Sequence, residues 1–337
     1  MGDGSMMKRN SFIDCLRGFA IILVVVGHAI QFATDNYDEI WIYKAIYSFH
    51  MPLFMFISGI TISNKQNEWG KWIVRKAKAL IIPFVVWLII PWVFKRNWSG
   101  FLHYLLEVFW DPTITYWFLI SLFFNHAVYA LSRSFFKVKS DVITLKIVMI
   151  DMAIVALASV LNLIHLPLGI ANISYYYFFY IIGYYVNQFQ IVSKVNKITY
   201  KIIVLVFSGG IWLLLLSMWK RGGCVNVMAD NSNTQILSSV MTMIAGRGVS
   251  YLNALFGIMM LVSMTDILMH FIPTKYTEYV GRNTMEIYLL HFYFINMINI
   301  GVFAVEIVLG VVTGILIPLC ISRIVRNDEF GRLLFGR

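Results

Sequence analysis

The sequence predicts an all-α, multi-pass membrane protein, and three observations support that prediction. Of the 337 residues, 59% are hydrophobic and only 13% are charged, and the mean hydropathy is +0.74. This composition excludes a water-soluble globular domain. Apolar runs of about 17–25 residues, long enough to cross a bilayer as helices, recur along the chain. The basic residues are concentrated in alternate loops, the pattern expected when the cytoplasmic loops of a membrane protein carry an excess of Lys and Arg.

Ten apolar runs predict about ten transmembrane helices joined mostly by short loops. They lie at residues 12–33, 43–62, 79–94, 113–131, 142–161, 173–189, 200–219, 250–269, 283–299 and 302–322. Two further stretches, 98–111 and 234–246, are too short or too mixed in polarity to span. We expect them to be re-entrant or interfacial elements added to an all-α helix bundle.

The distribution of positive charge predicts the orientation of this bundle. An even number of spans places both termini on one side. If that side is the cytoplasm, it holds nineteen of the 27 Lys and Arg residues, the opposite side holds six, and two lie within helices. Because positive charge is retained on the cytoplasmic side, we expect both termini there. The net charge of +10 then reflects topology, and we expect no nucleic-acid partner.

The ends of the chain and its cysteines add further expectations. Residues 1–6 read as a cloning remnant, so we expect a single transmembrane domain over residues 7–337. The three cysteines, Cys15, Cys224 and Cys320, are too few and too scattered for a disulfide framework or a metal site. We therefore expect no metal and no permanently bound cofactor.

Three ionisable residues interrupt the first predicted helix. At 100° per residue, Asp14, Arg17 and His28 fall within an arc of about 60°, with His28 about 16 Å beyond Asp14. Asp14 and Arg17 are three residues apart and can pair. Each such group costs roughly 2.5–3.5 kcal/mol to insert, which favours a functional polar path into the outer half of the membrane. The alternative is an anchoring ion pair at the helix end and a histidine that only bonds a neighbouring helix.

Five segments, taken in order, resemble the acyltransferase 3 family of membrane acyl-transferring enzymes. DCLRGFAIILVVVGH (14–28) resembles its opening box, with a histidine eleven residues after the arginine. SFHMPLFMFISGI (48–60), WIVRKAKALIIPFVVW (72–87), YWFL (116–119) and GRNTMEIYLLHF (281–292) resemble four later boxes. One departure is that position 60 is isoleucine, where the family more often has an aromatic residue. The resemblance covers nearly the whole chain and implies the stand-alone form, without a fused hydrolase-type domain, in a bacterial inner membrane.

The resemblance implies transfer of an acyl group, usually acetyl, from cytoplasmic acyl-CoA to a hydroxyl of a cell-surface polysaccharide or lipid-linked sugar. Acyl-CoA is then a donor substrate. His28 is expected to act as general base, taking the proton of the attacking hydroxyl, with Asp14 and Arg17 along the path to it. The candidate supporting residues are His50, His291 and Glu286.

The two substrates also need binding residues. Arg75, Lys76 and Lys78, at the start of the third predicted helix, are candidates to bind the phosphates of acyl-CoA. Arg133 and Arg282 are possible additions. Tyr116 and Trp117 are the candidate acceptor contacts because sugars stack on aromatic rings, although aromatic residues also mark every membrane interface.

The main alternative function is a proton-coupled transporter of a sugar, lipid or organic acid. A transporter explains the intramembrane charges but gives no role to the basic residues Arg75, Lys76 and Lys78. It also predicts a broken helix at corresponding positions in each half of the chain, a pattern that we do not find in the sequence. A non-catalytic scaffold leaves the charges without a purpose. The sequence leaves open the acceptor, the length of the acyl group, direct transfer or an acyl-histidine intermediate, and the oligomeric state.

Overall fold

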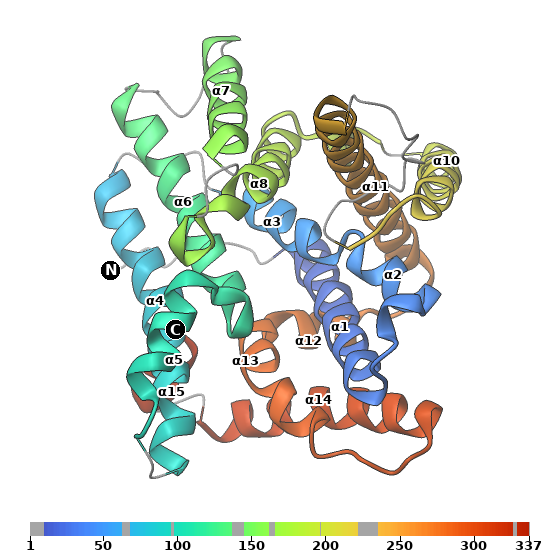
Figure 1. The fold of residues 1–337 in the computed structure, drawn as a ribbon. Helices are drawn as coiled ribbons and strands as arrows, with labels where there is room; N and C mark the ends of the chain where they lie inside the picture. Colours follow the sequence, from blue (N-terminus) through green and yellow to red (C-terminus); the bar gives the residue numbers. More distant parts are fainter. Residues whose placement is uncertain are drawn as a thin grey trace, which may run out of the picture. The chain divides into compact units, whose positions relative to one another are not determined.

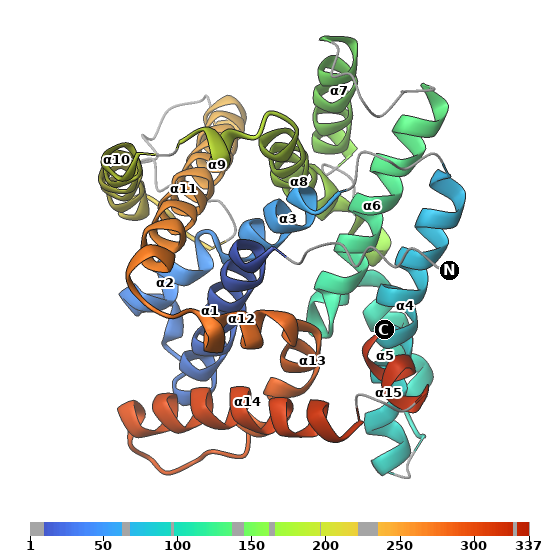
Figure 2. The ribbon, with the colours of Figure 1, turned by 180° about the vertical axis from the view of Figure 1, so that it is seen from behind.

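The computed structural model describes residues 10–62, 68–95, 98–136, 145–161, 166–195, 197–221, 235–325 and 329–336. Helices make up the secondary structure of these residues, and no strand occurs among them (Figures 1 and 2). The elements are α1 (Ser11–Ala33), η1 (Tyr37–Glu39), α2 (Trp41–Tyr47), α3 (His50–Ile60), α4 (Trp69–Lys95), α5 (Phe101–Trp110), η2 (Pro112–Ile114), α6 (Trp117–Phe135), α7 (Leu145–Leu161), η3 (Pro167–Asn172), α8 (Ile173–Gln188), α9 (Ile191–Lys194), α10 (Ile198–Leu216), α11 (Gln235–Phe271), α12 (Lys275–Arg282), α13 (Thr284–Ile295), α14 (Phe303–Val325) and α15 (Glu329–Phe335). The predicted all-α class is confirmed for this part of the chain.

Among the described residues, five helices are long and apolar enough to cross a membrane. They are Ser11–Ala33, Trp69–Phe94, Ile198–Leu216, Ala245–Phe271 and Phe303–Val325. Together with the composition, they indicate a multi-pass membrane protein. The count of ten spans and the cytoplasmic placement of both termini stay predictions. Residues 1–9, which include the proposed cloning remnant, lie outside the described residues.

The structure divides one of the predicted spans into two helices and shortens another. The span at 43–62 is broken between α2 and α3, where the Ser48 hydroxyl donates to the Ala45 carbonyl at 2.8 Å. Pro52 lies in the first turn of α3, a position that needs no backbone N–H. The span at 283–299 begins at a break at Asn283, whose side-chain amide donates to the Tyr279 carbonyl at 2.7 Å, and α13 has only 12 residues.

A third prediction is wrong because it separates residues that belong to one continuous helix. The stretch 234–246 was expected to be a separate re-entrant or interfacial element. Its described residues, 235–246, instead form the start of α11, a continuous helix of 37 residues. The helix continues through the glycines at positions 246 and 248, because each costs a helix only about 1 kcal/mol and no proline stands within α11. By contrast, the stretch 98–111 does contain a separate short helix, the 10-residue α5.

The chain divides into two compact units. The first comprises Met1–Ile57 and Val192–Leu319, and the second comprises Ser58–Ile191 and Cys320–Arg337. In the first, α10 and α11 lie side by side, and α1 packs against α12 and α13 (Figures 1 and 2). In the second, α4 packs against α6 and α15, and α7 packs against α8.

Glycines allow α1 and α12 to approach closely within the first unit. A β-carbon on Gly18 would collide with the carbonyl oxygen of Thr277. One on Gly281 would collide with the carbonyl oxygen of Asp14. The two helices therefore touch through their backbones, as small residues permit in membrane proteins. This contact brings the opening motif beside the late GRNT motif, although about 250 residues separate them in sequence.

Candidate active site

The polar line predicted on α1 begins at its contact with α12. Asn10 caps the helix, its side-chain oxygen accepting the backbone N–H of Phe12 at 3.0 Å. Asp14 is buried, at 7% exposure, and its backbone lies against Gly281, the residue before Arg282. Arg17 is half-buried one turn further on. The structure thus brings the predicted residues Asp14 and Arg282 to the same helix contact, while the Asp14–Arg17 pair stays a prediction.

His28, near the other end of α1, is held by two polar side chains. Its Nδ1 lies 2.9 Å from the amide oxygen Oε1 of Gln31, one helical turn further along. The hydroxyl of Tyr47, from α2, donates to the same oxygen at 3.1 Å. An amide oxygen can only accept, so Nδ1 of His28 carries the hydrogen and Nε2 carries the lone pair. A neutral histidine in this tautomer can take a proton at Nε2.

His291, on α13, lies beside His28. The two ring centroids are 5.2 Å apart, and the ring of Phe292 is within 4.4 Å of His28 and 4.3 Å of His291. His291 is fully buried, and its Nδ1 donates to the Ile287 carbonyl at 2.9 Å. Its Nε2 has no hydrogen-bond partner among the described residues. A second imidazole lone pair is therefore available close to His28.

His50, at the start of α3, completes the group of predicted histidines. Its Nδ1 donates to the Ile46 carbonyl at 2.9 Å, and its ring lies 4.6 Å from that of Tyr47. Tyr47 in turn lies 6.2 Å from the ring of His28. One tyrosine thus contacts both His28 and His50, and His28 in turn contacts His291. The three histidines singled out from the sequence therefore form one chain of ring contacts. Glu286, also buried, lies in the first turn of α13.

Further residues join this group without having been singled out as site residues from the sequence. The rings of Tyr43 and Tyr47 stack with centroids 3.9 Å apart. The guanidinium of Arg221 donates to the Tyr43 hydroxyl at 3.0 Å and lies 5.5 Å above the Tyr47 ring. Partial burial lowers the pKa of Arg221, but the neighbouring Tyr43, Tyr47 and Asp38 together raise it, so the residue stays charged. A fixed cation therefore borders the histidine group.

The predicted phosphate-binding cations differ in their availability. In the second unit, Arg75 and Lys78 are exposed on α4, whereas Lys76 is half-buried, its Nζ 5.5 Å above the ring of Trp72. Arg282, in the first unit, is half-buried at the end of α12. Arg75 and Lys78 are therefore the more exposed of these cations.

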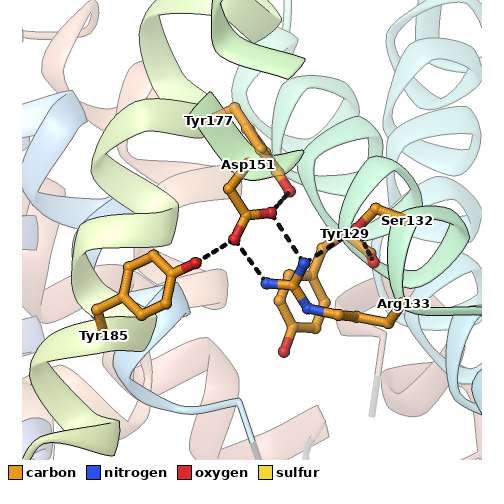
Figure 3. Close-up of polar contacts among 6 residues, drawn as sticks. All are labelled: Tyr129, Ser132, Arg133, Asp151, Tyr177 and Tyr185. Atoms are coloured by element: carbon orange, nitrogen blue, oxygen red, sulfur yellow. Dashed lines mark hydrogen bonds and ion pairs between the residues drawn. The ribbon is translucent and has the colours of Figure 1, made fainter. Parts of the chain in front are cut away.

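Arg133 has a different environment, which does not support its predicted role. It is 1% exposed, and its two terminal nitrogens bond the two carboxylate oxygens of Asp151 at 2.9 and 2.7 Å (Figure 3). Tyr177 and Tyr185 donate to the same carboxylate, and the Tyr129 ring lies 4.4 Å below the guanidinium. This pair joins α6 to α7, and removing one partner of a buried ion pair typically costs about 3–5 kcal/mol. The geometry gives Arg133 a structural role in the second unit.

The two candidate acceptor residues are also placed differently. Tyr116 is buried, with its ring 6.3 Å from that of Trp87. Trp117 is half-buried and lies 5.4 Å from the ring of Tyr176. Of the two, Trp117 therefore retains more exposed ring surface on which a sugar can stack.

Comparison with known proteins agrees with the resemblance found in the motifs. The model of the acyltransferase 3 family, described as an acyltransferase domain, matches residues 10–325. Nodulation protein NolL of Mesorhizobium japonicum is 26% identical over 191 residues, which cover 54% of this chain and 48% of that protein. Nodulation protein NolL of Sinorhizobium fredii is 36% identical over 122 residues, 33% of each chain. The matched segments span about half or less of these relatives, and no solved structure matches the chain significantly. Because the family model covers most of its length, the chain belongs to the acyltransferase 3 family.

Proposed function

We propose that the protein is a membrane O-acyltransferase that moves an acyl group, acetyl in the simplest case, from acyl-CoA to a carbohydrate hydroxyl. The single observation that carries the proposal is the hydrogen bonding of His28. Its Nδ1 is committed to Gln31, which leaves the Nε2 lone pair that a general base needs. Membership of an acyltransferase family supplies the reaction class.

In the proposed step, the oxygen of the acceptor hydroxyl attacks the carbonyl carbon of the thioester while Nε2 of His28 takes the hydroxyl proton. The carbon–sulfur bond then breaks, and the departing thiolate takes up the proton from the imidazolium. The products are the acyl ester and the CoA thiol. An alternative route, in which Nε2 attacks the carbonyl first and forms an acyl-histidine, uses the same lone pair and remains open.

The donor and acceptor contacts are proposed separately for each unit. In the first unit, Arg282 and Arg17 lie toward the end of α1 that we predict to be cytoplasmic, a suitable side for the phosphates of acyl-CoA. In the second, Arg75, Lys76 and Lys78 are the phosphate contacts and Trp117 is the acceptor contact. We propose a polysaccharide or lipid-linked sugar as acceptor, and a bacterial inner membrane as the location.

The test is CoA release from acetyl-CoA by detergent-purified protein, comparing wild type with His28→Ala. We expect slow release by the wild type even without the acceptor, and a loss on the order of 10²-fold or more in the variant. His103→Ala is the matched control because His103 is an exposed histidine on α5, paired with Glu107. Unchanged release by His28→Ala would refute His28 as the base. If acetyl-CoA does not bind the wild type at all, a proton-coupled transporter becomes the better account of the buried histidines.

A further inference from the structure

We propose that Gln31 and Tyr47 are positioning residues that hold His28 in the tautomer with its lone pair on Nε2. This inference rests on the proposed function, in which His28 is the base. Neither residue belongs to the motifs that identify the family, and both are recognised only from the contacts in the structure. Their role is comparable to that of the groups that orient a catalytic histidine in other enzymes, but it is performed here by a neutral amide.

The amide oxygen of Gln31 is the centre of the arrangement. It accepts from His28 Nδ1 at 2.9 Å and from the Tyr47 hydroxyl at 3.1 Å, and a carbonyl oxygen has two lone pairs for two such donors. Tyr47 therefore does more than fill space: by occupying one lone pair, it fixes the orientation of the Gln31 amide. The Tyr47 hydroxyl also lies 3.4 Å from Nδ1 itself, so the opposite tautomer could accept from it. That tautomer would place a lone pair against the Gln31 oxygen and exchange the 2.9 Å hydrogen bond for the longer one.

Neighbouring rings limit the rotation of His28. The ring of Phe292 lies 4.4 Å away on α13, and that of Tyr47 lies 6.2 Å away in an edge-on orientation. A free imidazole in water exchanges its tautomers and rotates. The contacts with Gln31, Tyr47 and Phe292 restrain both motions, so Nε2 keeps one position. Holding a base in place is worth a substantial part of its catalytic effect.

Arg221 contacts Tyr43, which in turn stacks on Tyr47, so it helps to hold Tyr47 beside Gln31 and His28. It donates to the Tyr43 hydroxyl at 3.0 Å, and Tyr43 stacks on Tyr47 at 3.9 Å. Among the described residues, the titratable or charged groups that interact with His28 include Tyr47 from α2, His50 from α3, His291 from α13 and Arg221 after α10. None of these four is a carboxylate, although the carboxylate of Asp38 lies 3.9 Å from Arg221. A carboxylate introduced at position 31 therefore adds a negative charge next to the imidazole itself.

The test compares Gln31→Leu, which removes the acceptor, with Gln31→Glu, which keeps it and adds a negative charge. We expect Gln31→Leu to lower kcat for CoA release by about 10- to 100-fold, as loss of an outer hydrogen-bond partner does elsewhere, with little change in KM for acetyl-CoA. Gln31→Glu should recover most of the rate. Its pH–rate profile should have the acid limb at higher pH, because the carboxylate stabilises the protonated imidazole. Ser159→Ala, which removes a hydroxyl bonded to its own helix on α7, is the folding control.

A second measurement decides the proposal independently of activity. In ¹⁵N-histidine-labelled protein, the His28 signals, assigned by their absence in His28→Ala, should show protonated Nδ1 and unprotonated Nε2. Gln31→Leu should show a mixture of tautomers. The proposal is overturned if Gln31→Leu keeps the wild-type tautomer, or keeps the wild-type rate and pH profile. If the wild type releases no CoA but the tautomer depends on Gln31, the positioning holds and the proposed function alone fails.

Discussion

Among the buried histidines, His291 and His126 differ in the partners of their ring nitrogens. His291 has Nδ1 bonded to the Ile287 carbonyl but no partner for Nε2 among the described residues. His126, in the other unit, bonds the Tyr180 hydroxyl at 2.6 Å. A buried polar atom without a partner costs about 1–3 kcal/mol. This cost brings no stability, and a second lone pair beside the proposed base His28 is the simplest reason for the protein to retain it.

This difference predicts opposite effects of the same substitution. His291→Leu should leave the thermal unfolding midpoint unchanged or higher, because it removes an unsatisfied nitrogen, while CoA release falls by about 10-fold or more. His126→Leu should lower the midpoint, because it strands the Tyr180 hydroxyl. Thermal unfolding in detergent and the CoA assay measure the two effects. A lower midpoint with unchanged activity in His291→Leu would make His291 a structural residue.

The sequence predicts residues of this site to different extents. The motifs identify His28, His50 and His291, because each lies in a family-like box, and the structure places them near one another. Gln31 could have been noticed from its spacing, since it lies three residues after His28 on the same helix. Arg221 offers no such signal. Its relation to Tyr43 exists only in the folded chain, across 178 positions.

At the scale of helices, the contact of α1 with α12 depends on two glycines. Gly281→Ala should place a β-carbon against the Asp14 carbonyl, and backbone on both sides leaves no flexible group to move away. We expect the variant to lose several degrees of thermal midpoint and most of its CoA release. Gly210→Ala, on α10, is the matched control, because its added β-carbon would meet no atom within 4 Å and alanine favours a helix by about 0.5–1 kcal/mol. Equal midpoints for the two variants would show that the close approach is dispensable.

Hydropathy predicts the presence of helices more accurately than the positions at which they break. The apolar run at 43–62 gives no sign that Ser48 ends one helix and that another begins at His50, because the break is made by side-chain hydrogen bonding. The same holds at Asn283. In α11, a stretch of mixed polarity that was predicted to be a separate element instead belongs to one long helix. Local hydrogen bonds and packing, which a hydropathy window averages away, decide these cases.

For the whole molecule, the predicted topology depends on whether the segment containing α2 and α3 crosses the membrane. These helices have 7 and 11 residues, and neither alone is long enough to span. If the chain does cross there, residues before α2 and after α3 lie on opposite sides. The excess of positive charge on the predicted cytoplasmic side favours that crossing.

Single cysteines placed on either side of this segment test the crossing. In a background with the native cysteines replaced by serine, Asp35→Cys and Lys71→Cys occupy exposed positions before α2 and on α4. A membrane-impermeant maleimide added to intact cells with a permeable outer membrane should label position 35 and not position 71, whereas both should react after lysis. Labelling of both in intact cells would mean that α2 and α3 enter and leave on the same side. The number of spans would then be odd, and the termini would lie on opposite faces of the membrane. The sides from which we propose that donor and acceptor approach His28 would then be wrong.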